Sequence, residues 1–217
     1  MMIKRSLKYL PILCLTLWAA TGVARADTMS YTLTVDGCTG GCGTGPYGTV
    51  TLTQSGSNVN VTETLDSGYY FLNSGAGQPL AFNLSTAGTI TNVQLLAYFA
   101  AGGTATASTF GSFTDSIQCT TACGSGSSNS FNIPQSLTFT VDGVTVSDFI
   151  ANADGYFFAS DVAQAVNVNG VWTIISTGNV GANGPSTPPV IPEPPSLLLL
   201  GTGLAALAGM MKLKAMA

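Results

Sequence analysis

Residues 49–65 read Thr49-Val-Thr-Leu-Thr-Gln-Ser-Gly-Ser-Asn-Val-Asn-Val-Thr-Glu-Thr-Leu65, and they decide the fold class. Apolar and polar side chains alternate in residues 49–53 and again in residues 58–65. This period of two is typical of half-buried β-strands, because successive strand side chains point to opposite faces of a sheet. Gln54-Ser-Gly-Ser57 separates the two runs with turn-forming residues. The stretch therefore predicts two strands joined by a turn.

The same pattern recurs through most of residues 27–184, which are enough for one domain with a sizeable core. About ten short strands, with a turn about every 8 to 12 residues, predict an all-β fold, a jelly-roll-like β-sandwich. Asp142-Gly143, between two alternating runs, predicts a hairpin. Residues 161–165 break the pattern and predict a helical turn. The further predicted strands are residues 30–35, 69–72, 80–84, 93–100, 110–118, 137–141, 144–149, 156–159 and 171–176.

Charged side chains are distributed unevenly along the chain. All six Lys and Arg lie in the first 25 or the last six residues, and there is no histidine. Residues 27–191 contain nine carboxylates and no cation, so their formal charge is −9 (nine acids minus zero bases). This is the opposite of a surface that binds nucleic acid. The usual general bases, phosphate clamps and imidazole metal ligands are also missing, and we expect no enzyme.

The first 26 residues have the pattern of a signal peptide. Three basic side chains in the first eight residues precede an apolar run over residues 9–23. Ala24 and Ala26 then supply small residues at the minus-three and minus-one positions, which predicts cleavage before Asp27. The alternative is an uncleaved N-terminal anchor, for which the apolar run is short.

The last 33 residues predict a spacer and a membrane anchor. Six of the eleven residues 185–195 are proline, which favours an extended, semi-rigid linker. Residues 196–211 are uncharged and mostly apolar, and Lys212 and Lys214 follow them. As a helix these 16 residues would span about 24 Å, which suffices for one transmembrane helix with snorkelling lysines that stay cytoplasmic. A buried core helix is the alternative.

Ile191-Pro-Glu-Pro194, followed by the apolar segment and the basic end, resembles the PEP-CTERM sorting signal of exported bacterial proteins. The resemblance covers about the last 27 residues. It implies processing by an exosortase, a transpeptidase-like membrane enzyme that recognises Pro192, Glu193 and Pro194. Body segments such as Cys38-Thr-Gly-Gly-Cys42-Gly also resemble a β-rich domain that recurs in PEP-CTERM proteins of unknown function.

Four cysteines remain after removal of the signal peptide, in the clusters Cys38–Cys42 and Cys119–Cys123. An even count in an exported chain predicts disulfides. Three pairings exist, and we favour the two local ones, which would fix loop shape more than they raise global stability. A four-thiolate zinc site is the alternative, but the spacing of three intervening residues and an oxidising compartment disfavour it.

Carboxylates near one another in the sequence raise the question of a cation site. Asn152 and Asp154, with Asp148 and Asp161 nearby, could offer oxygen ligands to Ca²⁺. Their spacing matches no EF-hand loop, so a solvated loop is the favoured reading. We expect no cofactor, with Ca²⁺ as the exception to test.

Two other sets could act on sugars. Glu63 and Asp66 could act as the acid and the nucleophile of a glycosidase, although nothing in the sequence fixes the distance between the two carboxylates. Tyr70, Tyr156 and Trp172 could offer stacking platforms, while core packing is the competing role for these aromatics.

We therefore predict a non-enzymatic exported protein of the cell surface or extracellular matrix. It would cross the inner membrane, remain as an anchored precursor and then be processed. We expect exopolysaccharide as its partner, because a hydroxyl-rich surface without cations can bind it by hydrogen bonds. The alternative function is that of a carbohydrate-binding module. The predicted parts are the signal peptide (1–26), the β-sandwich (27–184), the proline-rich linker (185–195) and the transmembrane helix with its basic tail (196–217).

Overall fold

The computed structural model describes residues 27–72, 78–120, 135–186 and 201–203. The chain divides into two compact units, one of residues 26–190 and one of residues 1–25 with 191–217. In the second unit only residues 201–203 are described, and they are helical. The predicted signal peptide, most of the linker and the rest of the predicted transmembrane helix lie outside the described residues. Within the described part of the chain, no helix has the length and hydrophobicity needed to cross a bilayer.

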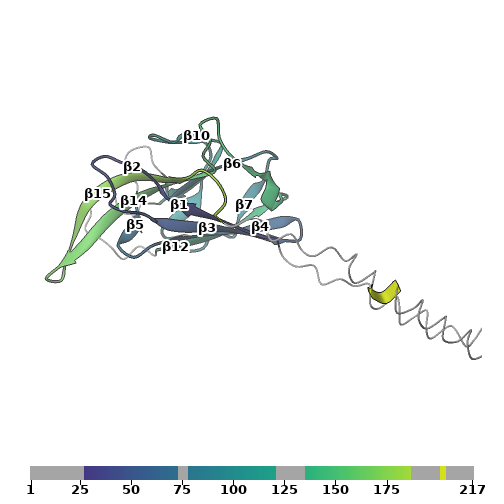
Figure 1. The fold of residues 1–217 in the computed structure, drawn as a ribbon, viewed down its shortest axis with the longest axis horizontal. Coiled ribbons are helices and arrows are strands. Elements are labelled where there is room, and N and C mark those ends of the chain that lie inside the picture. Colours follow the sequence, from purple (N-terminus) through teal and green to yellow (C-terminus); the bar gives the residue numbers. More distant parts are fainter. Residues whose placement is uncertain (1–26, 73–77, 121–134, 187–200, 204–217) are drawn as a thin grey trace, which may run out of the picture. The chain divides into compact units, whose positions relative to one another are not determined.

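The unit of residues 26–190 is built from antiparallel β-sheets, as the sequence predicts (Figure 1). Its described residues form fifteen strands, more than the ten expected, because several are only two to four residues long. The first sheet has five strands. In spatial order they are β1 (Thr28–Leu33), β3 (Gly48–Ser55), β4 (Asn58–Leu65), β12 (Ser136–Asp142) and β7 (Thr89–Thr91).

The second sheet is larger, and its main path has six strands. These are, in spatial order, β2 (Val35–Cys38), β15 (Val171–Ala182), β14 (Phe158–Val168), β6 (Leu80–Leu84), β11 (Asp115–Cys119) and β8 (Phe99–Ala101). Two short strands complete it, because β5 (Tyr69–Phe71) pairs with β14 and β13 (Phe149–Ile150) pairs with β6. A separate hairpin consists of β9 (Ala105–Ala107) and β10 (Gly111–Phe113).

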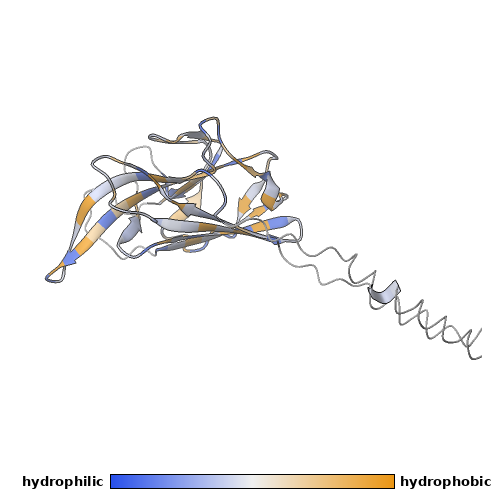
Figure 2. Ribbon diagram, in the orientation of Figure 1, coloured by the Kyte–Doolittle hydropathy of each residue, from blue (hydrophilic) through white to orange (hydrophobic). Residues whose placement is uncertain are grey.

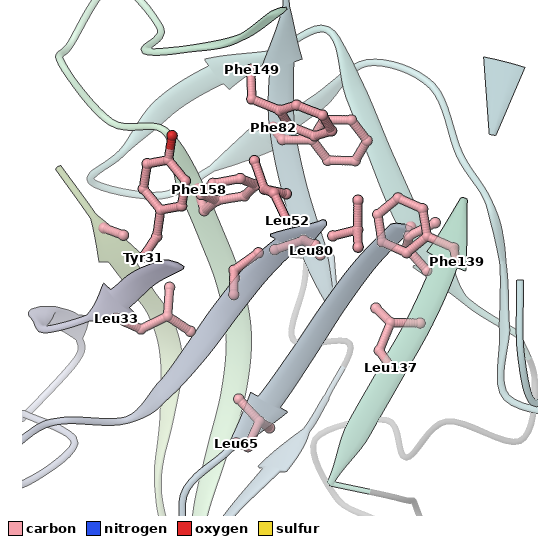
Figure 3. Packing of buried hydrophobic residues seen from close by; sticks show 14 of the residues in the cluster. Tyr31, Leu33, Leu52, Leu65, Leu80, Phe82, Leu137, Phe139, Phe149 and Phe158 are labelled. Atoms are coloured by element: carbon pink, nitrogen blue, oxygen red, sulfur yellow. The ribbon is translucent and has the colours of Figure 1, made fainter. Parts of the chain in front are cut away.

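The core lies between the two sheets. Every second side chain of β4 is buried, and of these Val59, Val61 and Leu65 belong to one cluster with Phe158 and Val162 of β14. Figure 3 shows how aromatic and aliphatic side chains from both sheets meet in this cluster. Two sheets that bury their facing side chains in one core form a β-sandwich.

The β9–β10 hairpin covers part of the outer face of the second sheet. Phe110, in the turn of this hairpin, and Ala159 of β14 belong to a second buried cluster. The Phe110 ring lies against two glycines of neighbouring strands, where a Cβ atom at Gly37 or Gly181 would come within 2.6 Å of it. The small size of these glycines therefore allows the hairpin to pack against the sheet.

The hairpin predicted at Asp142-Gly143 is wrong. β12 ends there, and the chain continues into a 3₁₀ helix, η2 (Val146–Asp148). Asp148 caps this helix, since its Oδ2 accepts hydrogen bonds from the backbone N–H and the hydroxyl of Thr145, at 2.8 and 2.7 Å. A local capping arrangement replaces the expected second strand of the hairpin.

The helical turn predicted for residues 161–165 is also wrong, because these residues lie inside β14. β14 is bonded to β15 along its whole length, and its polar side chains Ser160 and Asp161 are fully buried. The chain reverses at Asn169-Gly170, with φ angles of 54° and 83°, the left-handed conformations that a tight two-residue turn requires. The strand predicted over residues 93–100 is likewise shorter, since only Phe99 and Ala100 belong to β8.

Candidate functional site

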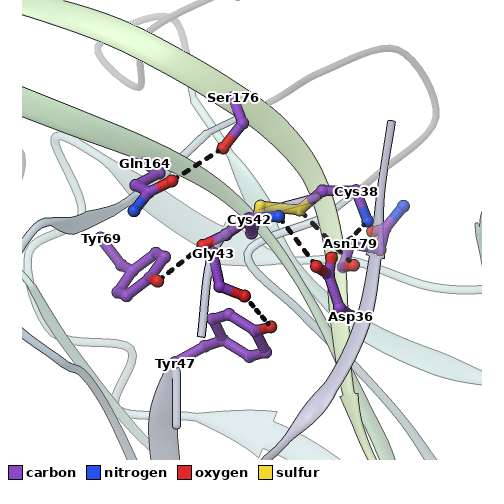
Figure 4. The surroundings of a disulfide bond; sticks show 9 residues. All are labelled: Asp36, Cys38, Cys42, Gly43, Tyr47, Tyr69, Gln164, Ser176 and Asn179. Atoms are coloured by element: carbon purple, nitrogen blue, oxygen red, sulfur yellow. Dashed lines mark hydrogen bonds between the residues drawn. A yellow bond between two sulfur atoms is a disulfide. The ribbon is translucent and has the colours of Figure 1, made fainter. Parts of the chain in front are cut away.

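A stapled loop connects β2 and β3 (Figure 4). Cys38 and Cys42 form the predicted disulfide. The Asp36 carboxylate holds both ends of the bridge, since it accepts hydrogen bonds from the backbone N–H of Cys38 at 2.8 Å and of Cys42 at 2.9 Å. A covalent bond and two charge-assisted hydrogen bonds thus fix the same five residues.

Two tyrosines support the loop from inside the sandwich. Tyr69 donates to the Cys42 carbonyl at 2.7 Å, and Tyr47 donates to the Gly43 carbonyl at 3.0 Å. Their rings meet edge to face at 5.3 Å. Burial, and next the Asp36 carboxylate, raises the pKa of both phenols, so both remain protonated donors at neutral pH. The sequence pattern indicated the disulfide but not the supporting roles of Asp36, Tyr47 and Tyr69. Asp36 belongs to β2 and Tyr47 comes just before β3, whereas Tyr69 is supplied by β5.

The loop also contains the one group of three potential metal ligands found among the described residues, Asp36, Cys38 and Cys42. The two sulfur atoms are bonded to each other and are therefore not thiolate ligands. This bond removes the four-thiolate zinc site considered from the sequence. The loop is a structural staple.

The other predicted disulfide is described at one end only. Cys119, the last residue of β11, is disulfide-bonded, while Cys123 lies outside the described residues, so that this pairing stays a prediction. Asp27, the residue expected after signal cleavage, is described, and its carbonyl accepts a hydrogen bond from the Gln54 N–H at 2.8 Å. The remaining predicted signal and sorting residues also lie outside the described residues: Ala24, Ala26, Pro192, Glu193, Pro194, Lys212 and Lys214.

The residues considered for calcium are used in separate local contacts. The Asn152 side-chain oxygen accepts the backbone N–H groups of Asp154 and Tyr156, each at 3.0 Å. Asp148 caps η2 and accepts the Ser85 hydroxyl at 2.7 Å, whereas Asp161 is buried within β14. Among the described residues, these carboxylates do not form a group with ligand atoms close to one another.

Glu63 cannot pair with Asp66 on a common surface, because its side chain points into the core. Glu63 has no exposed area, and neither of its carboxylate oxygens has a hydrogen-bond partner among the described residues. The Ser160 hydroxyl lies nearby but donates to the Pro79 carbonyl at 2.7 Å. Burial raises the pKa of Glu63 well above its ordinary value, and Ser160 opposes the shift weakly. The phase of the alternation in β4 already indicated this inward position.

The candidate stacking aromatics are engaged with other rings. Tyr70 and Trp172 meet edge to face at 5.5 Å, and Tyr156 meets Phe110 in the same way at 4.8 Å. All three candidates are half-buried. Each ring therefore packs against another aromatic ring and is also partly exposed to solvent.

A shallow cleft of about 540 Å³ lies beside the β9–β10 hairpin. Its lining is mixed. The polar lining residues are all neutral, namely Asn83, Thr104, Thr106, Ser112 and Thr114, and the apolar ones are Ala105, Phe113 and Ala153. Asn83 is held in place because its Oδ1 accepts the Thr114 backbone N–H at 2.7 Å. Such hydroxyls and amides can hydrogen-bond a neutral polar ligand without charge attraction. The sequence did not indicate this cleft, because its residues come from four separate segments.

Compared with known proteins, the chain matches no protein-family model, no curated protein and no solved structure.

Proposed function

We propose that this chain is a non-enzymatic exported protein of the cell surface or extracellular matrix. The observation that carries the proposal is the Cys38–Cys42 disulfide, in a loop whose ends Asp36 also holds. Structural disulfides persist in oxidising compartments and are rare in the cytosol. The signal-peptide pattern of residues 1–26 supports the same route.

The C-terminal segment would retain and then release the protein. In this proposal an exosortase-type enzyme recognises Pro192, Glu193 and Pro194, while the apolar helix and Lys212 and Lys214 hold the precursor in the membrane. The proposed architecture of the exported part is jelly-roll-like. Repeated passage of the chain between the sheets, as from β4 to β5 and from β6 to β7, supports this finer description.

Exopolysaccharide is the proposed contact of the exported domain. Its formal charge of −9 disfavours anionic ligands, whereas neutral sugars present hydroxyl groups that need no opposite charge. The neutral cleft at Asn83, Thr106 and Ser112 offers complementary donors and acceptors.

Fractionation of producing cells tests the sorting proposal. We expect intact-mass analysis of the exported wild-type protein to show loss of the residues after about 197, and Glu193→Ala to prevent that processing. Pro189→Ala, in the same spacer but outside the triplet, is the matched control and should be processed normally. If the wild-type protein keeps residues 197–217 in every fraction, the sorting proposal is wrong.

A true carbohydrate-binding module is the second candidate, which the neutral cleft and the partly exposed Trp172 favour. Glycan-array binding by the exported protein would support it if Thr106→Ala or Trp172→Ala abolishes the signal. Absence of array binding, with the protein found in the extracellular matrix, would favour the general surface role.

A further inference from the structure

The outer face of the five-stranded sheet carries a regular array of hydroxyl side chains. Along β3, three threonines alternate with buried Val50 and Leu52, so that the threonines point away from the core. In Figure 2, pale segments of intermediate hydropathy alternate with hydrophobic ones along β3. The strand registers align the outward side chains of neighbouring strands into three rows across the sheet. The first row is Thr32, Thr49, Thr64 and Ser136, the second is Ser30, Thr51, Thr62 and Thr138, and the third is Thr28, Thr53, Asn60, Thr140 and Thr91.

These three rows, which we call the hydroxyl face, contain no charged side chain. Of their thirteen side chains, twelve carry a hydroxyl group and the other is Asn60. Four of them are exposed, nine are half-buried and none is buried. The solvent side of an antiparallel sheet normally mixes polar and charged residues, and residues 27–191 include nine acids. The preference of threonine for strands therefore does not by itself explain a face without charge.

The hydroxyl groups of the face are held in position and keep hydrogen-bonding capacity for a ligand. The hydroxyl oxygens of Ser30 and Thr51 lie 3.4 Å apart, and those of Thr62 and Thr138 are separated by the same distance. Each pair uses one hydroxyl proton, which leaves the second proton and several lone pairs available for another partner. Because threonine is also restricted at χ1, the face presents ordered donors and acceptors.

The dimensions of the rows suit an extended sugar chain. Neighbouring strands are about 4.8 Å apart, so that a row offers a hydroxyl group about once per sugar ring and extends for about 14–19 Å. Successive rows follow about every 6.7 Å along the strands. Because sheets twist, each row is curved, and a linear chain with rotatable linkages can follow it better than a flat crystal surface can. Sugar hydroxyls also match those of the face, since both donate and accept.

We propose that the hydroxyl face binds a neutral, linear polysaccharide whose chain lies across the strands, along the rows. The inference rests on the proposed contact with exopolysaccharide and assigns the main part of that contact to this face instead of the cleft at Asn83. A hydrogen bond that replaces one to water contributes little alone, so that binding depends on many sugar rings held at once. Long chains should therefore bind, whereas single sugars should not.

Charge and polarity select this ligand over other partners. The formal charge of −9 on residues 27–191 repels anionic polymers. Asp142 places one of these charges at the margin of the face, two residues beyond Thr140, where it accepts the Thr91 hydroxyl at 2.9 Å. A second copy of the chain is disfavoured as well, because protein interfaces have apolar cores and the face has no large apolar side chain.

Native affinity electrophoresis of the exported full chain, purified from producing cells, tests the proposal. Gels that contain dextran, amylose or hydroxyethyl cellulose retard a protein that binds the embedded polymer, and we expect at least one of the three to retard the wild type. Thr51→Val/Thr62→Val/Thr138→Val should raise the polymer concentration for half-maximal retardation about tenfold, because it removes three of the four hydroxyls of the second row. Valine keeps the branched shape of threonine and its preference for strands.

The matched control makes the same three replacements in the cleft. Thr104→Val/Thr106→Val/Thr114→Val changes three threonines that line it, and this variant should be retarded as the wild type is. Thermal melting by circular dichroism verifies that both variants remain folded. If only the cleft variant loses retardation, the exopolysaccharide contact stands but its assignment to the hydroxyl face is wrong. Equal retardation of the two variants, or no retardation of the wild type by any of the three polymers, would also overturn the inference, whereas fractionation decides the sorting proposal independently.

Competition by oligosaccharides of the retarding polymer adds a test that needs only the wild type. A row accommodates about four sugar rings, so that inhibition of retardation should increase with oligosaccharide length up to about that size. Free glucose should not compete. If glucose competes as well as the longer oligosaccharides do, a small pocket binds the sugar and the proposal is wrong.

Discussion

The root of the β14–β15 hairpin and its arm, residues 165–176, follow one strand alternation but have opposite environments. In the root, residues 158–164 and 177–182, Phe158 and Val162 are fully buried between the two sheets. In the arm, Val166 and Val168 continue the same alternation but are exposed. A strand pattern therefore determines which side chains share a face, whereas neighbouring strands determine whether that face is buried. The buried contacts of this hairpin are therefore concentrated in the root.

Truncation of a root aromatic tests this comparison with the largest expected effect. Phe158 contacts Tyr31 edge to face at 4.8 Å and lies 6.1 Å from the Phe149 ring. We expect Phe158→Ala to lower the free energy of unfolding by about 3–5 kcal/mol, measured by urea denaturation. Ile175→Ala in the arm should change it by less than about 0.5 kcal/mol. Similar losses in the two variants would contradict the division between root and arm.

Glu63 faces the root across the core and should make stability depend on pH. Because burial raises its pKa in the folded state, folding favours the protonated form. The wild type should therefore lose stability as pH rises above the ordinary value near 4.5, by about 1.4 kcal/mol per unit until the folded-state pKa is reached. Thermal melting of Glu63→Gln should show a growing advantage over the wild type between pH 5 and 8. A constant difference would mean that Glu63 does not titrate in this way.

The pKa of Asp148 is shifted in the opposite direction to that of Glu63, so its effect on stability should have the opposite dependence on pH. Hydrogen bonds from the Thr145 backbone and hydroxyl, with that of Ser85, lower its pKa. The stabilisation from these bonds is present above the ordinary pKa and is lost as pH falls. Asp148→Asn should therefore have a lower melting temperature than the wild type at neutral pH, and the two melting temperatures should converge as the pH falls. Divergence toward acid would contradict this sign.

The disulfide loop adjoins the root, since Cys38 lies opposite Gly178 of β15. The bridge closes a short loop, because the two cysteines are only four residues apart in the sequence. The loop-closure relation gives about 2 kcal/mol for such a bridge. We expect the Cys38→Ala/Cys42→Ala variant to lose about that much in urea denaturation. A loss above about 4 kcal/mol would show that the bridge supports the root directly rather than fixing only the loop.

A change at the tip of the arm should have the smallest effect on the body. Gly170 has φ 83°, so Gly170→Ala introduces a left-handed alanine that costs about 1–2 kcal/mol within the turn. We expect faster hydrogen exchange in residues 165–176 and an altered Trp172 emission, with an almost unchanged melting temperature of the body. A melting temperature that falls as much as in Phe158→Ala would show that root and arm unfold together.

The sequence predicted the parts of this fold that depend on local patterns. Residues 49–65 form the expected strands, because their alternation and their glycine turn lie within one short segment. The hairpin predicted at Asp142-Gly143 was wrong because Asp148 accepts hydrogen bonds from Thr145, the N-cap residue. These bonds stabilise a 3₁₀ helix in place of a second strand. Asn169-Gly170 was the stronger turn signal, and it lies between the two longest strands. The cleft and the hydrogen bond from Tyr69 to the disulfide loop could not be predicted, because they bring together residues distant in the sequence.

The packing of Phe110 against Gly37 and Gly181 has a consequence for the evolution of this chain. A side chain at either glycine would collide with the ring, and Asn152 holds the Phe110 carbonyl in place at 2.6 Å. None of these positions can change freely while the others stay as they are. Related sequences should therefore show correlated substitutions, with larger residues at positions 37 and 181 only where the aromatic residue at position 110 has been replaced. In an ancestor that lost the Phe110 ring first, positions 37 and 181 would both have become free to accept larger residues.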